Sequence, residues 1–135
     1  MEKPHKKLEA WREAVDLTID IYQATDNLPK EHRFALTNQI HRVTLNVASN
    51  IAEGATRQTN KEFANHLHSA QASLSELDTQ LEIAKRLKIL GQEQCYRLNA
   101  QMNHIDKLPS GLIRHLRSQR AADTTPYPLP LTLHR

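Results

Sequence analysis

The sequence predicts an all-α protein, an antiparallel up-down-up-down four-helix bundle. Apolar residues recur with helical periodicity in four separate segments. Glycine occurs only three times, and there are few of the β-branched runs that favour a sheet. The connections between the four segments are short, so consecutive helices are expected to run antiparallel.

The first helix is expected over about residues 7–25 and carries two adjoining apolar stripes. The first comprises Leu8, Trp11, Val15, Thr18, Ile19 and Tyr22. The second comprises Ala10, Ala14, Leu17, Ile21 and Ala24. Together they span an arc of about 220°, wider than the roughly 100° that one core face requires.

The second helix is expected over about residues 31–51 or beyond, before a stop at Gly54. Its main apolar stripe comprises Leu36, Ile40, Val43, Val47 and Ile51. A second stripe comprises Phe34, Leu45, Ala48 and Ala52. The excess apolar surface on the first two helices predicts a homo-oligomer, because monomers seldom leave large apolar patches in water. The candidate interface residues are Leu17, Ile21, Phe34 and Leu45.

The third helix has the clearest signature, and Gly91 is expected to end it. Thr59 and Glu62 have the spacing of a capping box. The apolar residues that follow alternate by four and three, as in a heptad seam. They are Phe63, Leu67, Ala70, Leu74, Leu77, Leu81 and Ala84.

The fourth helix places Cys95, Leu98, Met102 and Ile105 on one face. Pro109 and Gly111 are expected to interrupt this helix before it resumes. Three prolines in residues 121–135 exclude a helix there. The chain is therefore divided into a bundle domain, residues 1–120, and a flexible proline-rich tail, residues 121–135.

The segment Leu45-Asn46-Val47-Ala48-Ser49-Asn50-Ile51-Ala52-Glu53-Gly54 resembles the "NIAEG" signature of a bacterial four-helix-bundle family, the 23S rRNA intervening-sequence proteins. Further similar segments are Lys7-Leu8-Glu9-Ala10-Trp11, Leu28-Pro29-Lys30-Glu31, Phe34 to Arg42, Lys61-Glu62-Phe63, Ser73 to Glu82 and Gly111-Leu112-Ile113-Arg114. The resemblance covers residues 7–117 in order and without large gaps.

This resemblance implies a bundle with no assigned catalytic residues. The family is related to the accessory variability protein of diversity-generating retroelements, a homopentamer that binds a reverse transcriptase and nucleic acid. The resemblance therefore implies that five is the favoured number of copies, and it points to a protein partner such as a reverse transcriptase.

The residues predict no metal, no cofactor and no catalytic group. No two histidines have the helical i,i+3 or i,i+4 spacing of metal ligands. The two nearest in the sequence, His66 and His68, lie two residues apart. Cys95 falls on an apolar face, as a buried structural cysteine does. Glu53 has no visible carboxylate partner for acid–base chemistry.

Basic residues concentrate towards the end of the chain. Residues 85–120 hold eight lysines and arginines against two acids, 8 − 2 = +6. The candidate nucleic-acid contacts are Arg57, Lys61, Lys85, Arg86, Lys88, Arg114, Arg117 and Arg120. Such contacts to phosphates would give salt-sensitive and weakly selective binding.

Three function hypotheses follow. The first is a homo-oligomeric scaffold or adaptor that contacts RNA or DNA, and the second is a protein–protein interaction module with no nucleic-acid role. An enzyme ranks last. A single cysteine and the lack of a membrane-spanning apolar run predict a cytoplasmic protein with no membrane partner.

Overall fold

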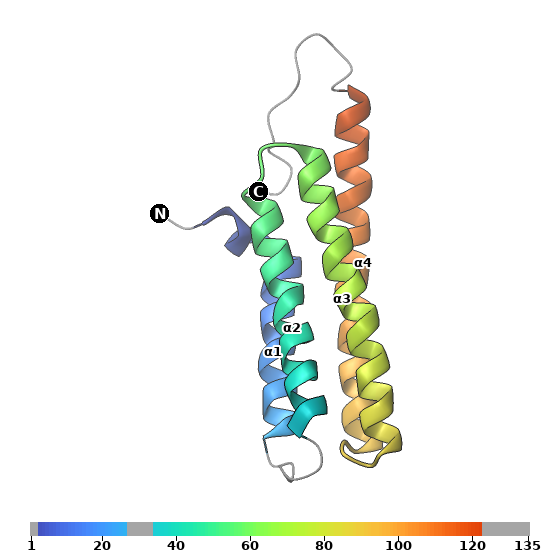
Figure 1. Cartoon of the computed structure of the whole chain (residues 1–135). Helices are drawn as coiled ribbons and strands as arrows, with labels where there is room; N and C mark the ends of the chain where they lie inside the picture. The colour runs from blue at the N-terminus through green and yellow to red at the C-terminus, as the bar shows by residue number, and fades with distance from the viewer. Residues whose placement is uncertain (1–2, 27–33, 123–135) are drawn as a thin grey trace.

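The computed structural model describes residues 3–26 and 34–122, and this part of the chain is all-α, without strands (Figure 1). A short 3-10 helix at Pro4–Lys7 precedes four α-helices. They are α1 (Glu9–Thr25), α2 (Phe34–Ala55), α3 (Asn60–Arg86) and α4 (Gln92–Ala122). The predicted fold class is confirmed.

The four helices form a closed bundle in which chain direction alternates from each helix to the next (Figure 1). Helix α1 packs against α2 and α4, and α3 packs against the same two helices. The α2–α3 pair is the most extensive and the α1–α4 pair the least. Over the described ranges, none of the helices is both long and apolar enough to cross a membrane.

Helix α3 follows its predicted pattern throughout. All seven residues of the heptad seam are buried, and Phe63 is fully enclosed. The Oγ1 atom of Thr59 accepts a hydrogen bond from the backbone N–H of Glu62 at 3.1 Å. This bond satisfies one of the free amides at the helix start, which confirms the Thr59 half of the predicted capping box.

Of the two apolar stripes on α1, the structure buries the one that the sequence assigned to an oligomer interface. Leu17 and Ile21 are 0% exposed and belong to the core of the bundle, so their assignment to an oligomer interface is wrong. Ala10 and Ala14 lie on the same buried face, where their small side chains permit close helix packing. The other stripe is only partly covered: Leu8 and Thr18 are buried, whereas Ile19 is 51% exposed.

Helix α4 is continuous across Pro109, so the predicted interruption at this proline is wrong. Proline lacks an N–H and crowds the preceding turn of a helix. Here the side-chain amide of Gln71 on α3 donates to the carbonyl oxygen of Asp106 at 3.2 Å and to Oγ of Ser110 at 2.7 Å. These cross-helix bonds hold the turn around the proline in place.

The connection between α3 and α4 does not use Gly91 as a helix stop. Lys88 instead takes the left-handed conformation, with φ 61°. The N–H of Ile89 donates to Ala84 O at 2.8 Å and the N–H of Lys88 to Lys85 O at 3.0 Å, the Schellman pattern. Gly91 precedes α4, and its N–H donates to Oε1 of Gln94 at 3.0 Å.

Gly54 serves helix packing rather than helix termination. Helix α2 runs one residue beyond it, and no glycine has a positive φ among the described residues. A Cβ atom on Gly54 would lie 2.8 Å from Cβ of His66 and 2.9 Å from Cδ1 of Phe63. The absence of a side chain therefore allows the end of α2 to approach α3.

Some predictions fall outside the described residues. These are the start of the second helix at residues 31–33 and the tail from residue 123 onward, together with the side chains of Phe34 and Arg120. Ala121 and Ala122, which the sequence assigned to the tail, belong to α4.

Two glycine substitutions separate packing from helix propensity. We expect Gly54→Ala to lower the free energy of unfolding by about 1–3 kcal/mol, because buried Phe63 and the backbone-anchored Cβ of His66 cannot yield freely. Gly111→Ala is the matched control: the nearest atom to its new Cβ is 3.8 Å away, and we expect a gain of about 0.5–1 kcal/mol. Urea unfolding followed by circular dichroism measures both. Equal effects of the two substitutions would contradict the packing role.

Candidate nucleic-acid interface

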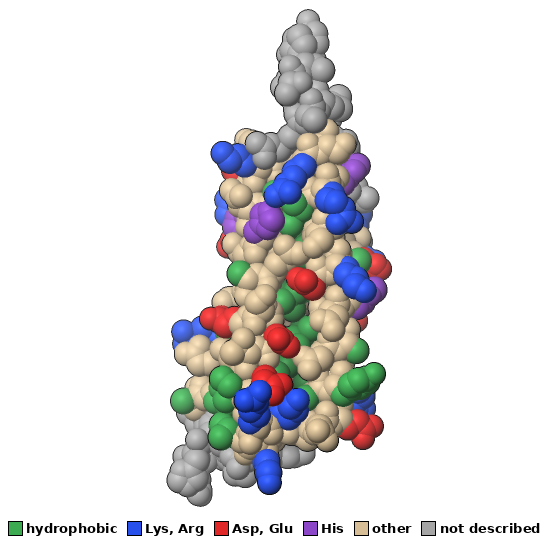
Figure 2. Space-filling view, turned by 90° about the vertical axis from the view of Figure 1, so that its right-hand side faces the viewer, with side chains coloured by type: hydrophobic (Ala, Val, Ile, Leu, Met, Phe, Trp, Pro, Cys, Tyr) green, Lys and Arg blue, Asp and Glu red, His purple; other side chains and the backbone are tan. Residues whose placement is uncertain are grey.

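The predicted basic residues form two clusters at opposite ends of the bundle rather than one surface. The upper cluster comprises Arg57, Lys61, Arg114 and Arg117. The lower cluster comprises Lys85, Arg86 and Lys88 at the α3–α4 connection. Lys61 and Arg86 are 25 residues apart on α3, which corresponds to about 38 Å along the helix. Figure 2 shows lysine and arginine side chains at both ends of one face, with acidic side chains between them.

Acidic neighbours partly neutralise the lower cluster. One carboxylate oxygen of Glu82 lies 3.1 Å from Nζ of Lys85, and the other accepts a hydrogen bond from Nε of Arg86 at 2.8 Å. The bond from Arg86, followed by that from Lys85, lowers the pKa of the Glu82 carboxyl. This carboxylate therefore competes with any phosphate for both cations.

In the upper cluster, Arg57 belongs to a polar network at the α2–α3 junction. Its guanidinium lies 3.7 Å from Oε2 of Glu53, and its Nε donates to Nε2 of His66 at 3.1 Å. Nε2 therefore accepts, and the ring proton sits on Nδ1, which lies 3.4 Å from Oδ1 of Asn50. The network holds Arg57 in a defined orientation at the end of the bundle.

Lys61, Arg114 and Arg117 complete the upper cluster and are exposed. The contacts of Gln71 with Asp106 and Ser110 set the antiparallel register of α3 and α4. Extending this register places Lys61 level with Arg117 and Ser118, since positions on paired antiparallel helices advance equally in opposite directions. None of these three cations forms a salt bridge within the part of the chain that the structure describes.

An exposed apolar stripe follows the line where α1 meets α2. Ile19, Tyr22 and Leu45 are 51%, 39% and 46% exposed. Tyr22 stacks on His41 with 3.9 Å between ring centroids, and this contact fixes the register that brings Ile19 level with Leu45. The α1–α2 stripe, as we name it, comprises Val15, Ile19, Tyr22, Leu45 and Ala48. Leu45 is the one predicted interface residue that the structure places on it.

Cys95 lies in the core, only 2% exposed. Its Sγ is directed towards the carbonyl oxygen of Leu81 at 3.9 Å. Burial raises the pKa of the Cys95 thiol; the positive charge of Lys85 opposes this to a smaller extent, and the negative charge of Glu82 adds to it. A raised pKa disfavours the thiolate, the nucleophilic form, so this side chain fills space as the sequence predicted.

The segment resembling the family signature supplies the α2–α3 junction. Ile51 is fully buried, while Asn50 and Glu53 face the ring of His66. The sequence singled out Glu53 but not His66. A histidine three residues after Phe63 is expected beside the buried seam, and Gly54 opposite it leaves room for the ring.

Comparisons with known proteins agree with this geometry. The family model of the 23S rRNA-intervening sequence protein matches residues 6–111. The fold is similar to the crystal structure of a protein of unknown function from the S23 ribosomal protein family of Bacteroides thetaiotaomicron, with a TM-score of 0.71. The two chains are 25% identical, and the match covers 77% of this chain and 97% of the other. A search of curated proteins finds no match.

The Cys95 thiol is expected to resist modification in the folded protein. Because it is the only cysteine, reaction with a disulfide reagent such as dithionitrobenzoate reports on it alone. We expect native protein to react on the order of 1,000-fold more slowly than protein in denaturant, because reaction requires an opening that costs several kcal/mol. Equal rates in both states would contradict the burial of this thiol.

Proposed function

Because this chain belongs to the 23S rRNA-intervening sequence protein family, we propose that it is a non-enzymatic homo-oligomeric scaffold in the cytoplasm that contacts RNA or DNA through its upper cluster. The observation that supports nucleic-acid contact most directly is the set of exposed cations Lys61, Arg114 and Arg117 at one end of the bundle. Cations without acidic neighbours can neutralise phosphates without first giving up an ion pair.

The lower cluster is a weaker candidate for the same role. Glu82 already pairs with Lys85 and Arg86, so a phosphate would have to displace a carboxylate that both side chains contact. Within residues 3–26 and 35–118, exposed aromatic side chains that could stack on bases are few, with Tyr96 the most exposed at 76%. Contact with the phosphate backbone, rather than base reading, fits this surface.

The α1–α2 stripe supports self-association. Ile19 and Leu45 each expose about half of their surface along the line where α1 meets α2, and Tyr22 lies on the same stripe. A second copy would cover this apolar surface, which a monomer would leave in water. We propose a pentamer, with the number five resting on the resemblance to the retroelement accessory protein.

A ring would amplify the charge of the upper cluster. Cyclic symmetry gives every copy the same orientation about the ring axis. If the bundles stand along that axis, all upper clusters lie on one rim. Five copies would carry a net charge of 5 × 3 = +15, and several clusters on one rim would bind a polyanion by avidity.

The alternative is a protein–protein interaction module that touches no nucleic acid, with a partner such as a reverse transcriptase. The same apolar stripe and the same cations could contact a protein. A pull-down with and without nuclease separates the two functions, because only the scaffold that we propose would lose a nucleic-acid-bridged partner.

We expect the triple variant Lys61→Gln, Arg114→Gln, Arg117→Gln to bind nucleic acid more weakly than the natural protein. Its plot of log affinity against log salt should flatten by about 0.9 per lost phosphate contact on duplex DNA. The matched control is Lys85→Gln, Arg86→Gln, Lys88→Gln in the lower cluster, which removes equal charge. Fluorescence anisotropy with duplex DNA, single-stranded DNA and structured RNA at about 50 mM salt measures both. Equal losses in the two variants, or no binding by the natural protein, would refute the upper-cluster assignment.

We expect Ile19→Glu with Leu45→Glu to dissociate the oligomer and leave a helical monomer, because buried carboxylates in an apolar contact are costly. The matched control is Ile83→Glu with Leu87→Glu, two apolar residues of similar exposure at the end of α3, where Leu87 is the C-cap. Light scattering on a sizing column gives the mass. A monomer mass for the natural protein at micromolar concentration would refute self-association, and a dimer or tetramer mass would refute only the number five.

A further inference from the structure

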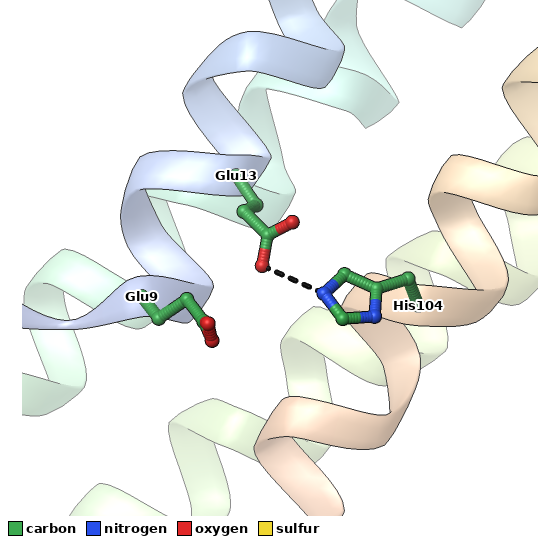
Figure 3. Close-up of side chains that lie close together, drawn as sticks. All are labelled: Glu9, Glu13 and His104. Carbon is green, nitrogen blue, oxygen red and sulfur yellow. Dashed lines mark ion pairs between the residues drawn. The ribbon is translucent and has the colours of Figure 1, made fainter.

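We propose that Glu9, Glu13 and His104 bind a divalent transition-metal cation such as Zn²⁺. One ligand atom from each of the three side chains lies within 4.8 Å of the other two. Oε2 of Glu13 is 3.0 Å from Nε2 of His104. Figure 3 shows the two glutamates extending from α1 and the histidine ring facing them from α4. The cation site lies outside the clusters and the stripe that carry the proposed function.

Helix geometry explains how the three ligands meet. Glu9 and Glu13 are four residues apart on α1 and therefore project from the same face. Helix α4 runs antiparallel to α1 and brings His104 level with Glu13. A search for paired histidines in the sequence misses this set, because its members come from two helices and only one of them is a histidine.

The donor set selects a class of cation. Imidazole nitrogen suits Zn²⁺ and its first-row neighbours, whereas Mg²⁺ and Ca²⁺ prefer oxygen donors throughout. Three protein ligands leave a coordination position for water. Tetrahedral Zn²⁺ with bonds of about 2.0–2.2 Å holds its donors about 3.4 Å apart. The Glu13 and His104 atoms at 3.0 Å would therefore separate slightly and any more distant donor would approach, and the exposed side chains of Glu9 and His104 can adjust.

An ion pair between Glu13 and His104 alone compensates the negative charge at this site less completely than a bound dication would. Oε2 of Glu13 is shielded from solvent, and although it is close to the ring nitrogen, no hydrogen bond to it has acceptable geometry. A carboxylate oxygen left in this state is costly. Glu9 adds a second negative charge beside it. A dication satisfies the shielded oxygen and neutralises both carboxylates, which one histidine cannot do.

The location gives the bound ion a structural effect. It would join α1 to α4, the least extensive of the four helix pairs. Farther along the same pair lies an open groove lined by polar residues, including Asp20, Gln23, Arg97 and Gln101. An ion that bridges the two helices stabilises the folded chain, because the unfolded chain does not hold the three ligands together.

The cation site and the α1–α2 stripe lie on different faces of α1. At 100° per residue, Glu9 lies about 80° and Glu13 about 120° from Ile19 around the helix axis. Self-association through the stripe therefore leaves the three ligands accessible. Failure of the metal proposal and failure of the scaffold proposal are thus independent outcomes.

The test uses untagged, metal-free full-length protein titrated with ZnCl₂ by isothermal calorimetry. We expect one Zn²⁺ per chain and a rise in the melting temperature. His104→Ala and Glu13→Gln should each weaken binding on the order of 100-fold and abolish the thermal shift, because each removes one direct ligand. His68→Ala and Glu76→Gln are matched controls at exposed positions on α3 and should bind as the natural protein does.

Ring signals of His104 in a nuclear magnetic resonance spectrum provide a second measurement that does not depend on variant folding. Saturating Zn²⁺ should shift the Nε2 resonance of His104 and leave that of His68 in place. Equal Zn²⁺ affinity in His104→Ala and the natural protein, or an unshifted His104 ring at saturation, would overturn the proposal.

Discussion

The close approach of α2 to α3 at Gly54 is the constraint on which the rest of the bundle depends. At this position a Cβ atom would meet His66 and the fully buried Phe63 at under 3 Å. Phe63 is also the first residue of the heptad seam, so the contact sets where the seam begins against α2. The resulting α2–α3 pair is the most extensive in the molecule. Helices α1 and α4 then complete the bundle around it.

The same junction gives the polar residues of the signature segment a structural role. Because Gly54 leaves room for His66, the imidazole lies beside Asn50 and Glu53. It accepts a hydrogen bond from Arg57. The two ends of the bundle thus differ in character. The upper end orients an arginine through a histidine, whereas the lower end pairs its cations with Glu82.

Sequence periodicity predicts the helices well because burial in a bundle requires one continuous apolar face. The seam of α3 is unambiguous, since the other large side chains of that helix, apart from Ile83, are polar or charged. On α1 both stripes are apolar, and periodicity carries no information on which one faces the core. The structure buries the stripe of Ala14, Leu17 and Ile21. The interruption predicted at Pro109 is wrong for a related reason: the amide of Gln71 that supports this turn of the helix is 38 positions away in the chain.

Sites whose residues come from two helices cannot be predicted from sequence spacing either, because the packing of the helices decides which residues meet. Cations of the predicted basic segment, such as Lys88 and Arg114, lie at opposite ends of the bundle because the helix between them rises by about 1.5 Å per residue. Conversely, Glu13 and His104 meet only because α1 and α4 are antiparallel. Helix α1 therefore presents three surfaces: a core face, an apolar stripe beside α2 and an acidic face beside α4. The packing of α1 and the two roles proposed for it, self-association and cation binding, therefore use different parts of its circumference.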